Sequence, residues 1–215
     1  MITGDEQYND STRSIYEKRE YDIVMSIRRR VGTTVKRDDV AENFALLSIT
    51  VGKVMAAVGQ TPMKNLDRET QDQLVFLGSL IQVGAGALIA EFFTDDPVAQ
   101  LGVALNLIGY GSFAIQFIRD EDDDRKLLVQ AMSSNLKEVL ANMIFLTDPK
   151  LWKKMYQIVG TFMLCIGNFL QAQGRKRLLD ESDDYTIFDP TVTAGTWMEA
   201  GGSMAIMLGN LAETV

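Results

Sequence analysis

The chain of 215 residues contains no histidine and only one cysteine, Cys165. The absence of histidine excludes Ser-His and Cys-His nucleophile pairs, histidine general bases and every metal site that uses histidine. A single cysteine can form neither an intrachain disulfide nor a cysteine-rich zinc site. Because Cys165 lies in the apolar sequence MLCIG without a basic neighbour, we interpret it as inert core packing in a reducing compartment.

Positive charge is also scarce, since 21 Lys and Arg residues face 29 Asp and Glu residues and give a net charge of −8. This charge repels phosphate backbones, and we expect no nucleic-acid partner. We interpret the short basic clusters at 28–30 with 36–37 and at 175–177 as solvated faces. The acidic runs 120–124 and 180–184 lack the spacing of an EF-hand loop, which favours solvated loops over a calcium site.

Motifs that carry chemistry are missing as well. The sequence has no phosphate-binding loop, no nucleophile elbow and no dinucleotide fingerprint. We therefore expect no catalytic residue, no cofactor and no bound metal ion, and we predict that the protein is not an enzyme. The N-terminal residues show neither a basic n-region nor an apolar h-region, so we expect a cytoplasmic protein, with membrane association left open.

Only four prolines occur, and each falls between apolar segments. Pro97, Pro149 and Pro190 directly follow an aspartate, which is typical of helix starts because the carboxylate caps free amides. Strand-like alternation is hard to find. The sequence predicts an all-α fold, a multi-helix bundle over residues 43–215, preceded by a charged segment, 1–42, with one helix at about 11–30.

An internal repeat is the clearest pattern in the chain. A small residue, six mostly apolar residues and a second small residue recur from starts at Gly52, Gly78, Gly102, Ser134, Gly160 and Gly202. The starts lie 24 to 42 residues apart, which is about one helix with its connection. We predict that the bundle consists of about six degenerate single-helix repeats.

The paired glycines of this unit require a physical reason, because each costs about 0.5–1 kcal/mol relative to alanine in a helix. Residues seven apart share one stripe of a helix, and a stripe without side chains lets two helices approach closely. We favour helix contact over a ligand or lipid lying against the stripe. The predicted helix-packing residues are Gly52, Gly59, Gly78, Gly86, Gly102, Gly109, Gly160, Gly167, Gly202 and Gly209.

Side-chain amides also recur at fixed places in the apolar helices. Such amides can bridge neighbouring helices and set their register. A polar channel or a site for a small polar ligand is the alternative interpretation. The predicted register-setting residues are Gln82, Asn106, Asn142, Asn168 and Asn210.

Three uncharged runs, 73–90, 97–118 and 155–174, approach the roughly 20 residues that span a bilayer. Other copies of the unit carry charge in the same segment, at Lys53, Lys137, Glu138 and Glu199. We therefore favour a soluble bundle with uncharged helices in the centre and charged helices outside. A glutamate in apolar sequence, such as Glu91 or Glu199, needs a partner and a pocket to act as an acid.

The repeated pattern GxxxxxxGN, followed by LQAQG at 170–174, resembles a group of repetitive helical proteins of Bacillus-like bacteria that are studded with Gly and Gln. The resemblance covers most of residues 43–215 and excludes residues 1–42. That family is functionally uncharacterised, so the resemblance implies the repeat architecture and no active site, ligand or partner.

Together these patterns favour a non-enzymatic helical repeat protein that acts by packing against protein partners, among them further copies of itself as a homo-oligomer. The second hypothesis is a membrane-active protein that inserts the apolar hairpin 73–118. The third is a helical bundle that binds a small molecule through its amides and glycine stripes.

Overall fold

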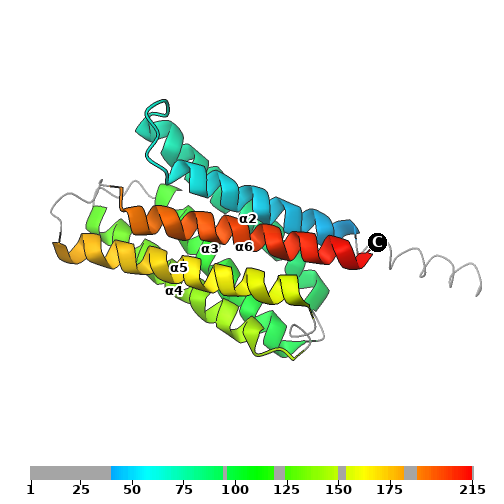
Figure 1. Cartoon of the computed structure of the whole chain (residues 1–215). Coiled ribbons are helices and arrows are strands. Elements are labelled where there is room, and N and C mark those ends of the chain that lie inside the picture. Colours follow the sequence, from blue (N-terminus) through cyan, green and yellow to red (C-terminus); the bar gives the residue numbers. More distant parts are fainter. Residues whose placement is uncertain (1–39, 94–95, 119–123, 150–153, 182–187, 215) are drawn as a thin grey trace, which may run out of the picture. The chain divides into compact units, whose positions relative to one another are not determined.

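The computed structural model describes residues 40–93, 96–118, 124–149, 154–181 and 188–214, and these residues are helical without strands. Residues Ala41–Val215 form one compact unit. The helices are Val40–Gly59, α2 (Arg68–Ala90) with the short 3-10 helix η1 (Glu91–Phe93), α3 (Pro97–Ile118), α4 (Asp124–Leu146), α5 (Met155–Glu181) and α6 (Pro190–Thr214) (Figure 1). The prediction of an all-α multi-helix bundle is confirmed, while the helix predicted at 11–30 lies outside the described residues.

Two of the three predicted Asp-Pro helix starts are confirmed. The Asp96 carboxylate accepts the amides of Val98 and Ala99 at 3.1 Å each, and Pro97 is the first residue of α3. Asp189 caps α6 in the same way. The third prediction is wrong for α5, because that helix begins at Met155, well after Pro149.

The helices form a closed ring. Each helix from α2 to α6 contacts the next one along the chain. Helix 40–59 closes the ring, because Gly52 meets Gly78 of α2 on one side and Thr50 Oγ1 lies 2.9 Å from Ser203 Oγ of α6 on the other. Figure 1 shows the start of helix 40–59 beside the end of α6. None of these described helices occupies the centre, so the expectation of central uncharged helices is wrong.

Glycines lie where antiparallel neighbours approach most closely. A Cβ atom on Gly52 would lie 2.6 Å from the carbonyl oxygen of Gly78, and one on Gly160 would lie 2.5 Å from that of Gly202. Real Cβ atoms do not approach a carbonyl oxygen so closely, so a side chain at either position would push the helices apart. The backbones of helix 40–59 and α2, and of α5 and α6, are therefore in direct contact.

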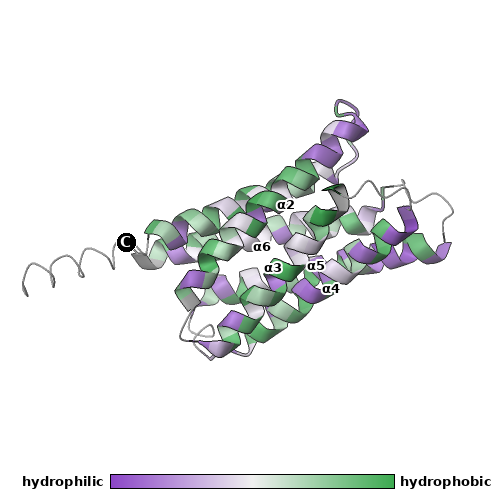
Figure 2. Ribbon diagram, turned by 180° about the vertical axis from the view of Figure 1, so that it is seen from behind, coloured by the Kyte–Doolittle hydropathy of each residue, from purple (hydrophilic) through white to green (hydrophobic). Residues whose placement is uncertain are grey.

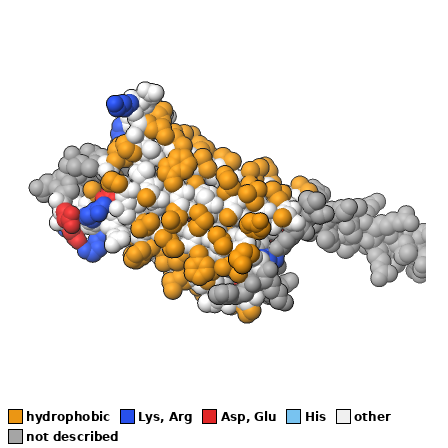
Figure 3. Space-filling view, in the orientation of Figure 1, with side chains coloured by type: hydrophobic (Ala, Val, Ile, Leu, Met, Phe, Trp, Pro, Cys, Tyr) orange, Lys and Arg blue, Asp and Glu red, His pale blue; other side chains and the backbone are white. Residues whose placement is uncertain are grey.

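The fully buried side chains of the ring are mostly small or polar, whereas many large apolar side chains are exposed on its outer surface. Most of the buried apolar residues are alanines. Buried polar or charged residues include Thr50, Lys53, Gln82, Ser134, Asn135, Glu138, Asn142, Thr161, Asn168, Gln171, Arg175, Glu199 and Ser203. Hydrophobic residues dominate along the helices, and hydrophobic side chains cover the face of the molecule in the space-filling view (Figures 2 and 3). This distribution is the reverse of that in an ordinary soluble domain.

Candidate functional site: a buried charged network

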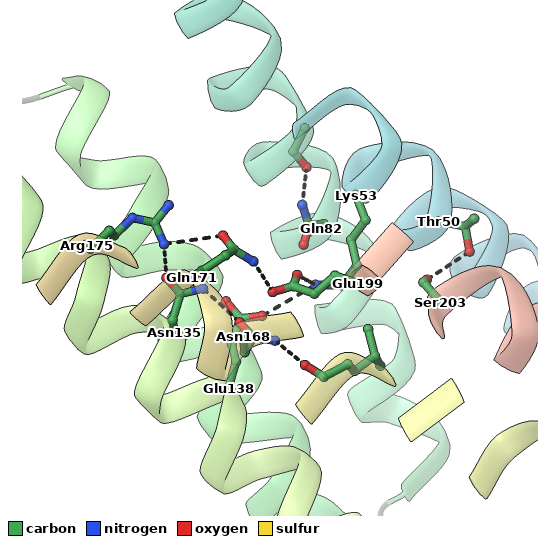
Figure 4. Close-up of polar contacts among 12 residues, drawn as sticks. Thr50, Lys53, Gln82, Asn135, Glu138, Asn168, Gln171, Arg175, Glu199 and Ser203 are labelled. Atoms are coloured by element: carbon green, nitrogen blue, oxygen red, sulfur yellow. Dashed lines mark hydrogen bonds and ion pairs between the residues drawn. The ribbon is translucent and has the colours of Figure 1, made fainter. Parts of the chain in front are cut away.

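The centre of the bundle holds an ammonium group between two carboxylates. Lys53 Nζ lies 2.6 Å from Glu199 Oε2 and 3.4 Å from Glu138 Oε2 (Figure 4). All three side chains are less than a tenth exposed. They come from helix 40–59, α4 and α6. These helices are far apart in the sequence, but all three line the interior of the ring.

Amide side chains continue this cluster toward a second cation. Gln171 Nε2 donates to Glu199 Oε1, and Gln171 Oε1 accepts from Arg175 Nη1 at 3.3 Å. The Arg175 guanidinium also donates to Asn135 Oδ1 and, at 3.2 Å, to Gln60 Oε1. Figure 4 shows these contacts, apart from the one to Gln60, as one connected group. We call the whole group the charged network: Lys53, Gln60, Asn135, Glu138, Asn168, Gln171, Arg175 and Glu199.

The charges of the network balance. Two cations, Lys53 and Arg175, lie with two carboxylates, Glu138 and Glu199, in the interior. An isolated buried charge is strongly unfavourable, and pairing with hydrogen bonding is what makes burial tolerable. Because Gln171 contacts both Glu199 and Arg175, an amide bridges the two charged parts of the network.

Aromatic rings cover both cations. Lys53 Nζ lies 5.0 Å from the ring centroid of Tyr110, and the Arg175 guanidinium carbon lies 5.2 Å from that of Phe113. Both rings come from α3, one turn apart. At this separation a ring face attracts a cation, so α3 stabilises both ends of the charged network without contributing a charge.

The structure brings the predicted amides to the interior in different roles. Asn168 accepts from Asn135 Nδ2 at 2.8 Å and thereby links α4 to α5. Asn210 Nδ2 donates to Asn43 Oδ1 at 3.0 Å and links α6 to helix 40–59. Gln82 is buried and donates to the Gly78 carbonyl oxygen of its own helix, and Asn142 is buried as well. Asn106 Oδ1 is buried without a hydrogen-bond partner among the described residues.

The predicted glycines face several kinds of neighbour. Cβ atoms on Gly59 and Gly167 would meet the carbonyl oxygens of Gln71 and Gly195. The remaining predicted positions face side chains: Gly86 faces Leu107, Gly102 faces Phe145, Gly109 faces Glu138 and Gly209 faces Tyr156. Sequence reasoning missed Gly195 and Gly174, which make equally close contacts between α5 and α6.

Two sequence expectations about charge are wrong. The prediction that charged helices lie outside a centre of uncharged helices is wrong, because Lys53, Glu138 and Glu199 pair with one another inside the ring. Arg175 is buried and does not belong to a solvated basic face, although its neighbours Lys176 and Arg177 are exposed. Glu91, by contrast, is exposed in η1, and the structure gives it no role in the charged network.

Sequence reasoning also missed Asn135, Gln171 and Arg175. The available signal was spacing, since Asn168, Gln171 and Arg175 recur at intervals of three and four residues, which puts them on one face of α5. Asn135, Glu138 and Asn142 recur in the same way on α4. A polar face on an otherwise apolar helix indicates the side that avoids an apolar environment.

A cavity of about 180 Å³ inside the ring adjoins the charged network and is lined by residues from all six helices. Lys53 and Tyr110 line one end of it, and Glu42, Gln157 and Asn210 line the other. Asn106 also lines this cavity, so its unpaired carbonyl oxygen lies next to free space. A group of three or more acidic, Cys or His side chains suited to a metal ion is absent from the part of the chain that the structure describes. Cys165 is half-buried on α5.

These features define an all-α bundle of single helices around a polar, charge-balanced interior. A family model described as a family of unknown function, DUF6944, matches residues 41–207, and the chain belongs to that family. The match begins where the compact unit begins. The chain matches no curated protein and no solved structure.

Proposed function

We propose that the protein is an integral membrane bundle whose helices cross the bilayer and enclose the charged network. The observation that carries this proposal is the reversed polarity of the fold, with large apolar side chains outside and charged and amide side chains inside. In lipid the apolar groups need no partner, whereas ionisable groups must face the bundle interior and pair there. Both conditions are met here.

The outer surface is apolar on every helix of the ring. Large apolar side chains that are from about half to nearly two-thirds exposed, one from each helix, are Phe44, Leu77, Ile108, Leu140, Phe169 and Leu208. The exposed charged side chains of the described helices lie near helix ends, as at Arg68, Asp124 and Lys176. A monomeric soluble protein rarely exposes a continuous apolar surface of this kind.

Helix lengths fit a bilayer. Three helices, Val40–Gly59, Arg68–Ala90 and Pro97–Ile115, are long and apolar enough to cross a membrane. Helices α4, α5 and α6 contain 23, 27 and 25 residues, which also exceeds the roughly 20 residues needed. Their inner faces carry most of the charged network, while their outer faces expose apolar side chains such as Leu140, Phe169 and Leu208.

This proposal reverses the soluble bundle favoured by the sequence. The exposed apolar surface also supports the protein-packing role, since further copies of the chain or another protein could cover it. In both cases the activity would be non-enzymatic, and that absence of enzymatic activity stays a prediction.

Fractionation separates the two functions. The full chain, expressed with a small tag, is expected in the membrane pellet and should resist extraction with alkaline carbonate. It should leave the pellet only with detergent. Recovery of the protein in the cytosolic fraction as a discrete oligomer without detergent would contradict the membrane proposal and support the packing role.

A further inference from the structure

Three cavities lie in series inside the ring. Their volumes are about 180, 40 and 150 Å³. The first and second cavities share the lining residues Lys53 and Tyr110. The second and third share Gln60 and Phe113. Each cavity therefore ends where the next begins, and an aromatic ring of α3 lies at each junction.

The order of the cavities is the same along every helix of the ring. On α5, Leu164 lines the first cavity, Gln171 the second and Arg175 the third. On the antiparallel helix α6 the sequence order is reversed, with Ser203, Glu199 and Val192 lining the first, second and third cavities. Unrelated surface hollows would not follow six helices in one order, so the cavities define a column along the bundle axis.

This column extends over most of the bundle. The first cavity reaches Glu42 and Asn210, near the start of helix 40–59 and the end of α6. The third cavity reaches Arg68 at the start of α2 and Asp189, which caps α6. If the helices cross a bilayer, the column connects the two sides of that membrane.

The lining of the column determines what could pass through it. Lys53 and Arg175 repel cations, while Glu138 and Glu199 disfavour anions. Fixed charge in a pore excludes ions of the same sign, and here both signs stand close together. In the first cavity, amides and hydroxyls provide hydrogen bonds beside apolar residues such as Leu46, Ile49 and Val103. The buried Asn106 Oδ1 has no hydrogen-bond partner among the described residues.

The middle cavity has the smallest volume of the three, about 40 Å³. Tyr110 and Phe113 separate it from the wider cavities on either side. The column is therefore interrupted beside these two rings in this conformation.

We propose that this column is a permeation path for small uncharged solutes that form hydrogen bonds, such as polyols, and that Tyr110 and Phe113 close it in this conformation. The inference rests on the proposed membrane insertion. It extends the polar-channel interpretation of the repeated amides.

Permeability of reconstituted liposomes tests the path, with glycerol as the probe. The double variant Tyr110→Ala with Phe113→Ala removes both rings, and Ile108→Ala is the matched control because Ile108 lies on the outer face of the same helix. The rate of glycerol entry is followed by light scattering after rapid mixing. It should be about ten-fold higher in the double variant than in the control, which corresponds to a permeation barrier lower by about 1.4 kcal/mol. Potassium efflux should stay at the level of protein-free liposomes.

A further variant distinguishes a path from a leak. Adding Val103→Trp to the double variant fills the first cavity and should return glycerol entry to the control level. An unchanged glycerol rate in the double variant, an equal rise in potassium efflux, or a rise that Val103→Trp fails to reverse would each overturn the path. Failure of the protein to float with the liposomes would overturn membrane insertion itself, and the path with it.

Discussion

The first three described helices and the last three differ in composition but not in their outer surfaces. Helix 40–59, α2 and α3 each contain a window that is apolar enough to cross a membrane, whereas α4, α5 and α6 do not. Yet Leu77 and Ile108 in the first half are exposed to the same extent as Leu140 and Leu208 in the second. The two halves therefore present the same kind of surface to their surroundings.

The difference lies in the inner faces. The second half contributes Asn135, Glu138, Asn168, Gln171, Arg175 and Glu199 to the charged network, and the first half contributes Lys53 and Gln60. An average over a whole helix mixes the face that contacts neighbours with the face that contacts the environment. Mean hydropathy therefore underestimates the apolar surface of α4, α5 and α6.

The largest effect is expected where the two halves meet, at Lys53. Lys53→Met leaves Glu138 and Glu199 without their cation, and breaking such a buried pair typically costs about 3–5 kcal/mol of stability. Thermal unfolding of the purified protein in detergent measures this loss. Adding Glu199→Gln should recover part of it, because one of the two unpaired charges is then removed.

Lys137→Met is the control for that prediction. Lys137 is half-buried on α4 and, among the described residues, donates to the Ser112 hydroxyl at 3.3 Å, outside the charged network. Its loss should change the unfolding temperature little. Equal effects of the Lys53 and Lys137 variants would show that the charged network does not stabilise the fold.

A charge on the outer face tests whether both halves face lipid. Leu77→Arg in α2 and Leu140→Arg in α4 should each cost about 2.5–3.5 kcal/mol on insertion scales. The amount of each variant in the membrane fraction reports the effect, and Met155→Arg at the start of α5 is the control near a helix end. If Leu77→Arg is depleted and Leu140→Arg is not, only the first half lies in the membrane.

Helix contacts at glycine give a smaller effect. Alanine at Gly52 in the first half or at Gly167 in the second would place Cβ 2.6 Å from a facing carbonyl oxygen. Overpacking of this kind costs about 1–3 kcal/mol. Gly84→Ala is the control, since nothing lies within 4 Å of its added Cβ, and it should gain about 0.5–1 kcal/mol from helix propensity. Unfolding temperatures that fall equally for all three variants would contradict the close contacts.

The smallest effect concerns the helix caps outside the apolar region. Burial by itself raises the pKa of Asp189, but the Arg177 guanidinium and the first-turn amides of α6 outweigh it and hold the pKa below the usual 3.8. A carboxyl group whose pKa is lowered on folding stabilises the fold at pH values above its ordinary pKa. This contribution disappears as the pH falls through the folded-state pKa. Asp189→Ala should therefore cost about 1 kcal/mol near neutral pH.

The pH dependence of that cost is the measurement. The difference in unfolding temperature between Asp189→Ala and the unmodified chain should shrink as the pH falls below about 4. Asp67, which caps α2 through the Thr70 amide at 2.7 Å, is the equivalent residue in the first half and should behave alike. A difference that stays constant with pH would show that the carboxylate charge has no role in the cap.

Local signals in the sequence were sufficient for the helices. Apolar runs, scarce prolines and the Asp-Pro starts at 96–97 and 189–190 predicted helical elements, because caps and propensities depend on neighbouring residues. The same signals misplaced the start of α5. The recurring glycines and amides were noticed, but their contacts were not, since Gly167 meets Gly195 and Asn168 meets Asn135 only across helices.

Which polar faces pair with one another was decided by the tertiary structure alone. In the sequence, Lys53 is 85 residues from Glu138 and 146 residues from Glu199. No local pattern shows that these residues pair. Once they pair, their burial becomes tolerable, and the large apolar side chains are left on the outside. The sequence determined the helices, their caps and their small residues. The closed ring determined which polar faces meet, because pairing buried charges requires partners that only the folded bundle brings together.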